Sequence, residues 1–196
     1  MWTLFGVSVV VSLAAAGTPA ALTSAGRAAA SSSPAATGAA TMTRFVSKEY
    51  GYSFAIPGSE PDWVLEPATA RWTQGSLSPG APQFDSLFDL SNGRFFIVGA
   101  RDLPARSTLA EWTRYFLSSP ALACRRTSRI SRSTLAGVPA RSYTFTCSDA
   151  YGIGIDAVHG RHGYFMVLSH HGAGSVSSAH RREFELARRS FRIGQH

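Results

Sequence analysis

Histidine and cysteine are the residue types of this chain best suited to chemistry, and it holds six histidines and two cysteines. His159 and His162 flank a glycine-containing turn and could bind a metal together with Asp156 or Asp149. His170 and His171 follow eight or more residues later, about 25 Å along an extended strand, so the two pairs cannot share an ion. No His-Glu-x-x-His or Cys-His spacing is present. We therefore expect surface histidines, no metal site and no cofactor.

The cysteines, Cys124 and Cys147, lie on either side of a turn at Thr134–Val138. Paired residues of an antiparallel hairpin have a constant sum of residue numbers, and the cysteine sum of 271 centres on Leu135 and Ala136. The two thiols could then lie opposite each other and form one disulfide, which would stabilise the fold by roughly 3 kcal/mol. The alternative is a pair of buried thiols.

Motifs for nucleophilic catalysis are absent from the sequence: it has no Gly-x-Ser-x-Gly and no Ser-x-x-Lys. Asp85 and Asp89 are four residues apart on an expected strand and hence on one face, where we interpret them as solvent-side charges. We predict that the chain is not an enzyme. The alternative is a hydrolase whose site the sequence does not reveal.

A proline-rich segment carries two tryptophans, Trp63 and Trp72, and long connections of this kind are often functional. Either both rings plug the open end of a sheet, or they line a groove for an apolar or peptide partner. In the second case Arg71, Arg94 and Arg101 would rim the groove.

The last expected helix, residues 177–189, carries a second set of basic residues. Phe184 and Ala187 fall on its buried stripe, and the exposed side carries four arginines that only Glu185 offsets. These arginines are Arg181, Arg182, Arg188 and Arg189. They either bind an anionic lipid or polymer or only keep the helix soluble.

The whole chain has a formal charge of +7, from 18 arginines, one lysine and 12 acidic residues. Such a balance favours anionic lipid headgroups or acidic envelope polymers as partners. We expect no nucleic-acid binding, because no recognition motif is present. The oligomeric state stays open.

The N-terminal region resembles an export signal. Residues 2–16 carry no charge, small residues follow, and the first basic residue is Arg27. We predict a signal peptide at residues 1–22, a linker rich in Ala, Ser, Thr, Gly and Pro at 23–43, and one domain at 44–196. The protein would be secreted or otherwise extracytoplasmic, unless an uncleaved signal anchors it.

Within the domain, alternating apolar residues predict a hairpin at 44–47 and 52–56 and strands near 84–90 and 95–98, the latter covered on both faces. Thr108 and Glu111 form a capping-box pattern that starts a helix. Strands near 125–134, 140–148, 151–158 and 163–170 form a meander before the final helix. The sequence thus predicts an α+β fold, in which an antiparallel sheet of six to seven strands is flanked by two helices.

Three short motifs resemble those of PsbP-like proteins: Tyr50–Pro57 (YGYSFAIP), Leu135–Ala140 (LAGVPA) and Ser190-Phe191. Secreted actinobacterial proteins of the LpqN type are similar, although this chain lacks their lipobox cysteine. The resemblance implies a PsbP-like fold and a non-enzymatic binding or assembly role. We therefore expect an exported, non-catalytic protein of the cell envelope that binds a protein or lipid, with a secreted hydrolase as the alternative.

Overall fold

The computed structural model describes residues 41–58, 62–73, 80–118, 125–126 and 128–194. The predicted signal and nearly all of the predicted linker lie outside these residues. The first strand begins at Met42, two residues before the predicted domain start. Within the described chain, no helix is both long enough and apolar enough to cross a bilayer.

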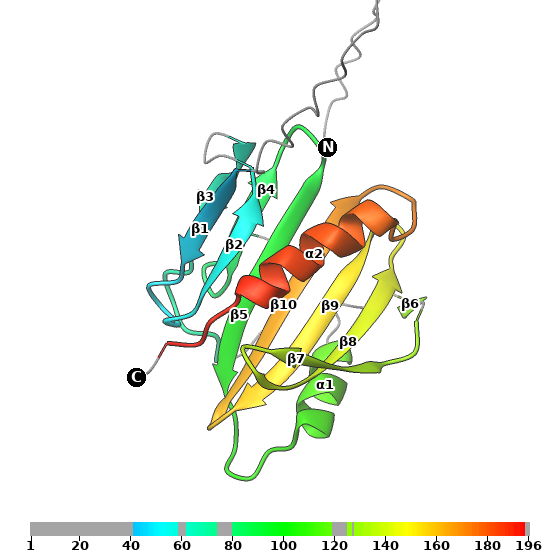
Figure 1. Cartoon of the computed structure of the whole chain (residues 1–196). Helices are drawn as coiled ribbons and strands as arrows, with labels where there is room; N and C mark the ends of the chain where they lie inside the picture. The colour runs from blue at the N-terminus through cyan, green and yellow to red at the C-terminus, as the bar shows by residue number, and fades with distance from the viewer. Residues whose placement is uncertain (1–40, 59–61, 74–79, 119–124, 127, 195–196) are drawn as a thin grey trace, which may run out of the picture. The chain divides into compact units, whose positions relative to one another are not determined.

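The predicted α+β class is confirmed: in the described part of the chain, two helices flank antiparallel sheets (Figure 1). β1 (Met42–Val46) and β2 (Ser53–Pro57) pair with each other in a two-stranded sheet. The main sheet has eight strands in the order β3-β4-β5-β10-β9-β8-β6, and β7 also pairs with β8. Its strands are β3 (Val64–Glu66), β4 (Asp85–Asp89), β5 (Arg94–Asp102), β6 (Arg125–Arg126), β7 (Ser131–Leu135), β8 (Val138–Thr146), β9 (Ala150–His159) and β10 (His162–His171).

The predicted C-terminal meander is confirmed, because β8, β9 and β10 pair in sequence order. The sheet is larger than the predicted six to seven strands. The strand predicted near 125–134 is two strands, β6 and β7. β3 is a further addition, and its three residues are too few to show a period of two.

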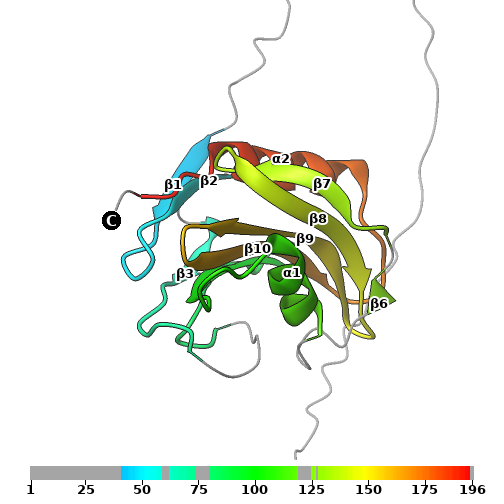
Figure 2. The ribbon, with the colours of Figure 1, turned by 90° about the horizontal axis from the view of Figure 1, so that it is seen from below.

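Both faces of the central strand β5 are buried, as its apolar sequence predicted. Phe96 and Val98 belong to the core on the side of β2 and α2 (Ser178–Ser190). Phe95 and Ile97 belong to the core on the side of α1 (Leu109–Leu117). Figure 2 shows the same arrangement, with α2 on one side of the sheet and α1 on the other. The sheet therefore separates two cores.

The predicted capping box at the start of α1 is confirmed. Thr108 accepts from the Glu111 backbone amide, while Glu111 reaches back to the Thr108 amide at 2.8 Å. Trp112 then packs on Gly163 of β10, and its Nε1 donates to the Tyr164 carbonyl at 3.0 Å. A cap and one tryptophan thus fix the helix on the sheet.

α2 and the residues that follow it pack on the α2-side core. Phe184 and Ala187 of α2 are buried, and the Phe191 ring stacks on Tyr52 at 5.1 Å between centroids. A backbone bridge between Ser53 and Arg192 joins the chain end to β2. α2 and the β1–β2 hairpin therefore form one covering layer.

The interpretation of Asp85 and Asp89 as solvent-side charges is wrong, because both side chains are buried. Asp85 accepts from the Tyr52 hydroxyl and from the Ala68 amide. Asp89 accepts from the Ser91 and Asn92 amides of the following turn and from Arg94. Both aspartates organise loops and their neighbouring strands, which is a structural role.

The β7–β8 hairpin turns one residue later than predicted, since its pairs sum to 273 and centre on Ala136 and Gly137. The residue numbers of the β6–β8 pair Arg125 and Thr146 sum to 271. The sum is smaller than in the hairpin because the chain between β6 and β7 contains extra residues that have no counterpart on β8. The numbers of Cys124 and Cys147 also sum to 271, so the register of β6 and β8 is the one that the predicted disulfide requires. Cys124 lies outside the described residues, so the disulfide stays a prediction.

Candidate functional site

The structure divides the sequence-predicted binding residues between two places on the fold. Trp72 belongs to the core on the α1 side and lines one cavity with Arg71 and Arg101, whereas Trp63 belongs to the core on the α2 side and lies beneath Arg94. Both indoles are buried, with 4% and 2% exposed for Trp63 and Trp72. Each ring thus belongs to the core, which agrees with the alternative in which the tryptophans fill the sheet's open end. In addition, Arg94 lies over the Trp63 ring and Arg101 over the Trp72 ring.

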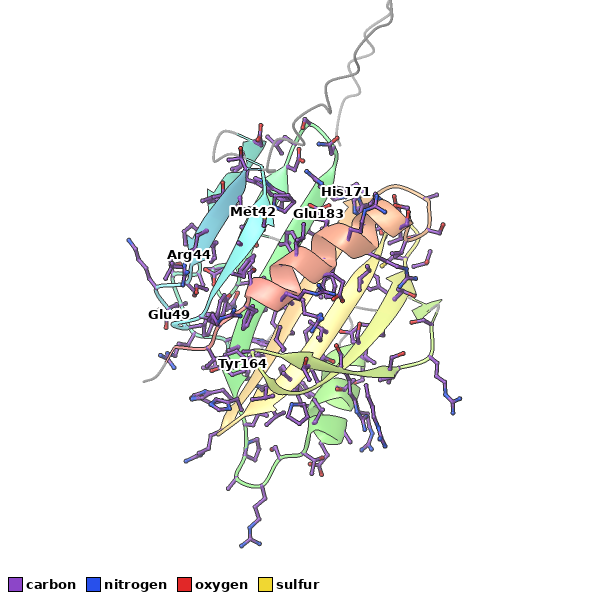
Figure 3. All side chains as sticks on the ribbon, viewed as in Figure 1. Met42, Arg44, Glu49, Tyr164, His171 and Glu183 are labelled. Atoms are coloured by element: carbon purple, nitrogen blue, oxygen red, sulfur yellow. The ribbon has the colours of Figure 1, made fainter. Side chains whose placement is uncertain are left out.

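The first place is a set of adjoining hollows that we call the His162 groove. It comprises an inner cavity of about 220 Å³, a neighbouring one of about 190 Å³ and an open outer part of about 750 Å³, all of which include His162 in their lining. The lining includes Tyr50, Arg71, Trp72, Arg101, Asp102, Arg161, Tyr164 and Arg192. In Figure 3 Glu49 and Tyr164 lie toward this end of the molecule, and His171 and Glu183 toward the other.

Arg101 is fixed at the inner end of the groove by aromatic rings. Its guanidinium carbon lies 5.5 Å from the Trp72 ring and 4.7 Å from the Tyr115 ring. Its Nη1 donates to the Tyr115 hydroxyl. Trp112 stacks on Tyr115 at 5.8 Å, so α1 supports the arrangement from behind.

Tyr50 forms a rigid wall of the inner cavity. Its hydroxyl donates to the Gln83 carbonyl at 2.6 Å and accepts from the Trp72 amide at 2.9 Å. Burial raises the pKa of this hydroxyl to about 12, so it stays neutral. Arg71 at the rim contacts Glu49 at 3.1 Å, in an exposed pair of small energetic weight.

His162 and His159 do not form the metal site considered from the sequence. His162 pairs through Nδ1 with Asp102 at 2.8 Å, and Asp156 is buried with the Tyr143 hydroxyl 3.2 Å away. Burial raises the pKa of Asp156 well above its usual value. The described residues contain no group of three or more histidines, cysteines or carboxylates placed to hold an ion.

The second place is the Arg94 cluster, formed by Trp63, Asp89, Arg94, His170, His180 and Glu183. Arg94 lies over Trp63 at 5.1 Å and bonds Asp89 at 2.6 Å and Glu183 at 2.7 Å. Burial opposes ionisation of Asp89, but its hydrogen bonds from Ser91, Asn92 and Arg94 lower the pKa. Burial raises the pKa of Glu183, although Arg94 counteracts it. The arginine therefore joins the β4–β5 turn to α2.

Two histidines of the Arg94 cluster stack face to face, with ring centroids 3.7 Å apart. Burial, His180 and Arg94 lower the pKa of His170 to about 4, and burial and Arg94 lower that of His180. Sequence reasoning missed this pair. Its one usable signal was the spacing of His180 and Glu183, which places both on one side of the helix.

The four arginines of α2 are not equivalent. Arg181 and Arg182 are exposed, and Arg189 is exposed while contacting Glu185 at 3.7 Å. Arg188 is partly buried: it bonds Glu185 at 2.6 Å and donates to the Thr134 carbonyl at 2.7 Å. The expectation that Arg188 lies on the exposed side is therefore wrong, because this side chain ties α2 to β7.

Comparison with known proteins rests on structure, since no protein-family model matches this chain and no curated protein matches it in sequence. The solution structure of cyanobacterial PsbP (CyanoP) from Synechocystis superposes with a TM-score of 0.53 at 14% identity, covering 82% of this chain and 97% of that one. LpqN of Mycobacterium tuberculosis, described as involved in cell envelope biogenesis, gives a TM-score of 0.40 at 13% identity, covering 79% and 91%. The fold is PsbP-like, as the sequence motifs predicted.

Proposed function

We propose that this chain is an exported, non-catalytic binding or assembly protein of the cell envelope and that it takes an anionic partner, protein or lipid, in the His162 groove. The observation that carries the proposal is the charge of the groove. Arg71, Arg101, Arg161 and Arg192 line it against Asp102, and Glu49 contacts Arg71. Four arginines and two carboxylates leave a surplus of two positive charges in one concave surface, which favours an anion.

Apolar surface in the same groove supports a partner larger than a simple ion. Val138 and Ile193 line its outer part, and Trp72 and Tyr50 line its inner part. Binding sites commonly combine an apolar wall with a few fixed polar groups. Export, which residues 1–22 predict, would bring such a site into contact with the envelope.

Charge removal in the full exported chain tests the proposal. Arg71→Gln with Arg161→Gln should weaken sedimentation with a washed envelope fraction by about tenfold or more, since each charge near an anionic surface contributes about 1 kcal/mol. The matched control, Arg181→Gln with Arg182→Gln, removes the same charge from α2. Equal binding by both variants, or loss only in the control, would overturn the proposal.

The alternative of a secreted hydrolase has one observation in its favour. Asp102 contacts Nδ1 of His162, so the other ring nitrogen, Nε2, is available to act as a general base. Asp102 is 71% exposed, so water screens the pair. In a screen with ester, amide and glycoside substrates, turnover that His162→Gln abolishes would replace the binding proposal with this alternative.

A further inference from the structure

Within the inner cavity of the His162 groove, the arrangement of cations points to a narrower ligand chemistry. We infer that this cavity is a subsite for a phosphate group, carried either by a soluble phosphate ester or by a lipid headgroup. The inference rests on the proposed function, since it specifies what the groove would recognise. At about 220 Å³ the cavity suits a headgroup-sized ion better than a drug-sized ligand.

Arg101 supplies the main cation of this subsite. Trp72 and Tyr115 hold its guanidinium, and only Nη1 is used by the Tyr115 hydroxyl. Among the described residues it has no carboxylate within ion-pair distance. A guanidinium that is already oriented loses little entropy on binding and can present two parallel donors to an oxyanion.

Arg71 and His162 complete the subsite from two other elements. Arg71 uses Nε and Nη2 for Glu49, which leaves Nη1, and this exposed pair can exchange its partner at small cost. His162 lies in the same lining, oriented by Asp102. A planar carboxylate is satisfied by one arginine fork, whereas a phosphate group has more acceptor oxygens and suits donors that come from several elements.

The test is calorimetric titration of the full exported chain with inorganic phosphate, glycerol 3-phosphate and acetate. We expect both phosphates to bind and acetate to bind at least about tenfold more weakly. Arg101→Gln should weaken phosphate binding by about tenfold or more, and Arg101→Lys should not restore it, because lysine keeps the charge but loses the stacked fork. Arg182→Gln is the matched control and should bind as the native chain does. An unchanged unfolding midpoint of Arg101→Gln would show that the fold is intact.

Vesicles distinguish the two sources of the phosphate. Sedimentation with phosphatidylglycerol but not phosphatidylcholine vesicles, abolished by Arg101→Gln and by added glycerol 3-phosphate, supports a lipid headgroup. Binding of the soluble esters without vesicle binding supports a soluble ester. Should phosphate neither bind nor compete while envelope binding still depends on Arg71 and Arg161, the subsite is overturned and the proposed function stands. Envelope binding that is indifferent to groove arginines overturns the proposed function itself.

Discussion

At the scale of single residues, the stacked pair His170 and His180 should make the free energy of unfolding depend on pH. The pKa of His170 lies near 4 in the folded protein, because burial, His180 and Arg94 disfavour the charged ring, against 6.5 for an ordinary histidine. The unfolded chain therefore binds the proton more readily, and stability should fall as the pH drops from 6.5 towards 4. The loss attributable to His170 is up to about 3 kcal/mol.

Urea unfolding of wild type and His170→Phe at pH 7.5 and 4.5 measures this effect. Phenylalanine keeps the stack with Tyr151 and His180 but cannot be protonated, so the difference between the two proteins should narrow or reverse at low pH. His159→Phe, at an exposed position, is the control and should follow wild type. Parallel pH curves for wild type and His170→Phe would contradict the assignment.

The hydrogen bond between Tyr52 and Asp85 gives a second prediction at this scale. Both side chains are fully buried, and Asp85 also accepts from the Ala68 amide at 2.8 Å. Tyr52→Phe should destabilise the protein by about 1 to 3 kcal/mol, because a buried carboxylate oxygen loses its donor. Urea unfolding of Tyr52→Phe and of the double variant with Asp85→Asn would show the coupling, and independent, additive costs would refute it.

Asp85 also shows what sequence can and cannot give for a single residue. Its period-two position predicted that it shares a face with Asp89, which is correct. Which face is covered depends on Tyr52, which is 33 residues away in the chain and directly precedes β2 of the separate two-stranded sheet. The same reason applies to Arg188, whose partner Thr134 is 54 residues distant.

At the scale of elements, α1 depends on one glycine of β10. A Cβ on Gly163 would lie 2.6 Å from the Trp112 ring, too close for either to stay in place. Gly163→Ala should cost about 1 to 3 kcal/mol by forcing the helix away from the sheet. In a Trp112→Phe background, where the smaller ring leaves room, the same alanine should cost less. Equal costs in both backgrounds would show that the contact does not limit packing.

The pairing of β6 with β8 supports the prediction of a disulfide between Cys124 and Cys147. The pairing of Arg125 with Thr146 has the residue-number sum that Cys124 and Cys147 share. Peptide mapping without reductant should find the two cysteines linked, and their loss should lower stability by roughly 2 to 4 kcal/mol. Cys124→Ser alone should do as much harm as the double replacement. Two thiols open to alkylation in the exported protein would disprove the link.

Helices and strands could be predicted where residues close together in the sequence determine them. The capping box of α1, the meander and the burial of both faces of β5 follow from residues close in sequence. The extra residues between β6 and β7 give the β6–β8 pairs a smaller residue-number sum than the β7–β8 pairs, so the cysteine sum predicted the turn one position too early. The three residues of β3 are too few to show a period. The separation of Trp63 from Trp72 required the sheet itself, since two rings nine residues apart lie in different cores.

At the scale of the whole molecule, some arginines form structural ion pairs and hydrogen bonds, and others line a groove. Arg94 and Arg188 are used to hold α2 against the sheet and the neighbouring strand, whereas Arg71, Arg101, Arg161 and Arg192 line one groove. The arginine surplus is evident from composition, but this division is not, because composition does not distinguish a structural ion pair from a binding surface. We therefore expect a partner to bind at the groove rather than at α2.

Export and oxidation should occur together in the whole chain, which is the last prediction. If residues 1–22 act as a signal, the full chain expressed in a bacterial host should leave the cytoplasm and reach an oxidising compartment. Its N-terminus should then fall after the small residues near Ala16–Ala20, and Cys124 and Cys147 should resist alkylation until reductant is added. Deletion of residues 2–22 should retain the chain in the cytoplasm with both thiols reactive. Protease-accessible chain that keeps Met1 would indicate an uncleaved anchor, and cytoplasmic full-length chain with reactive thiols would refute export.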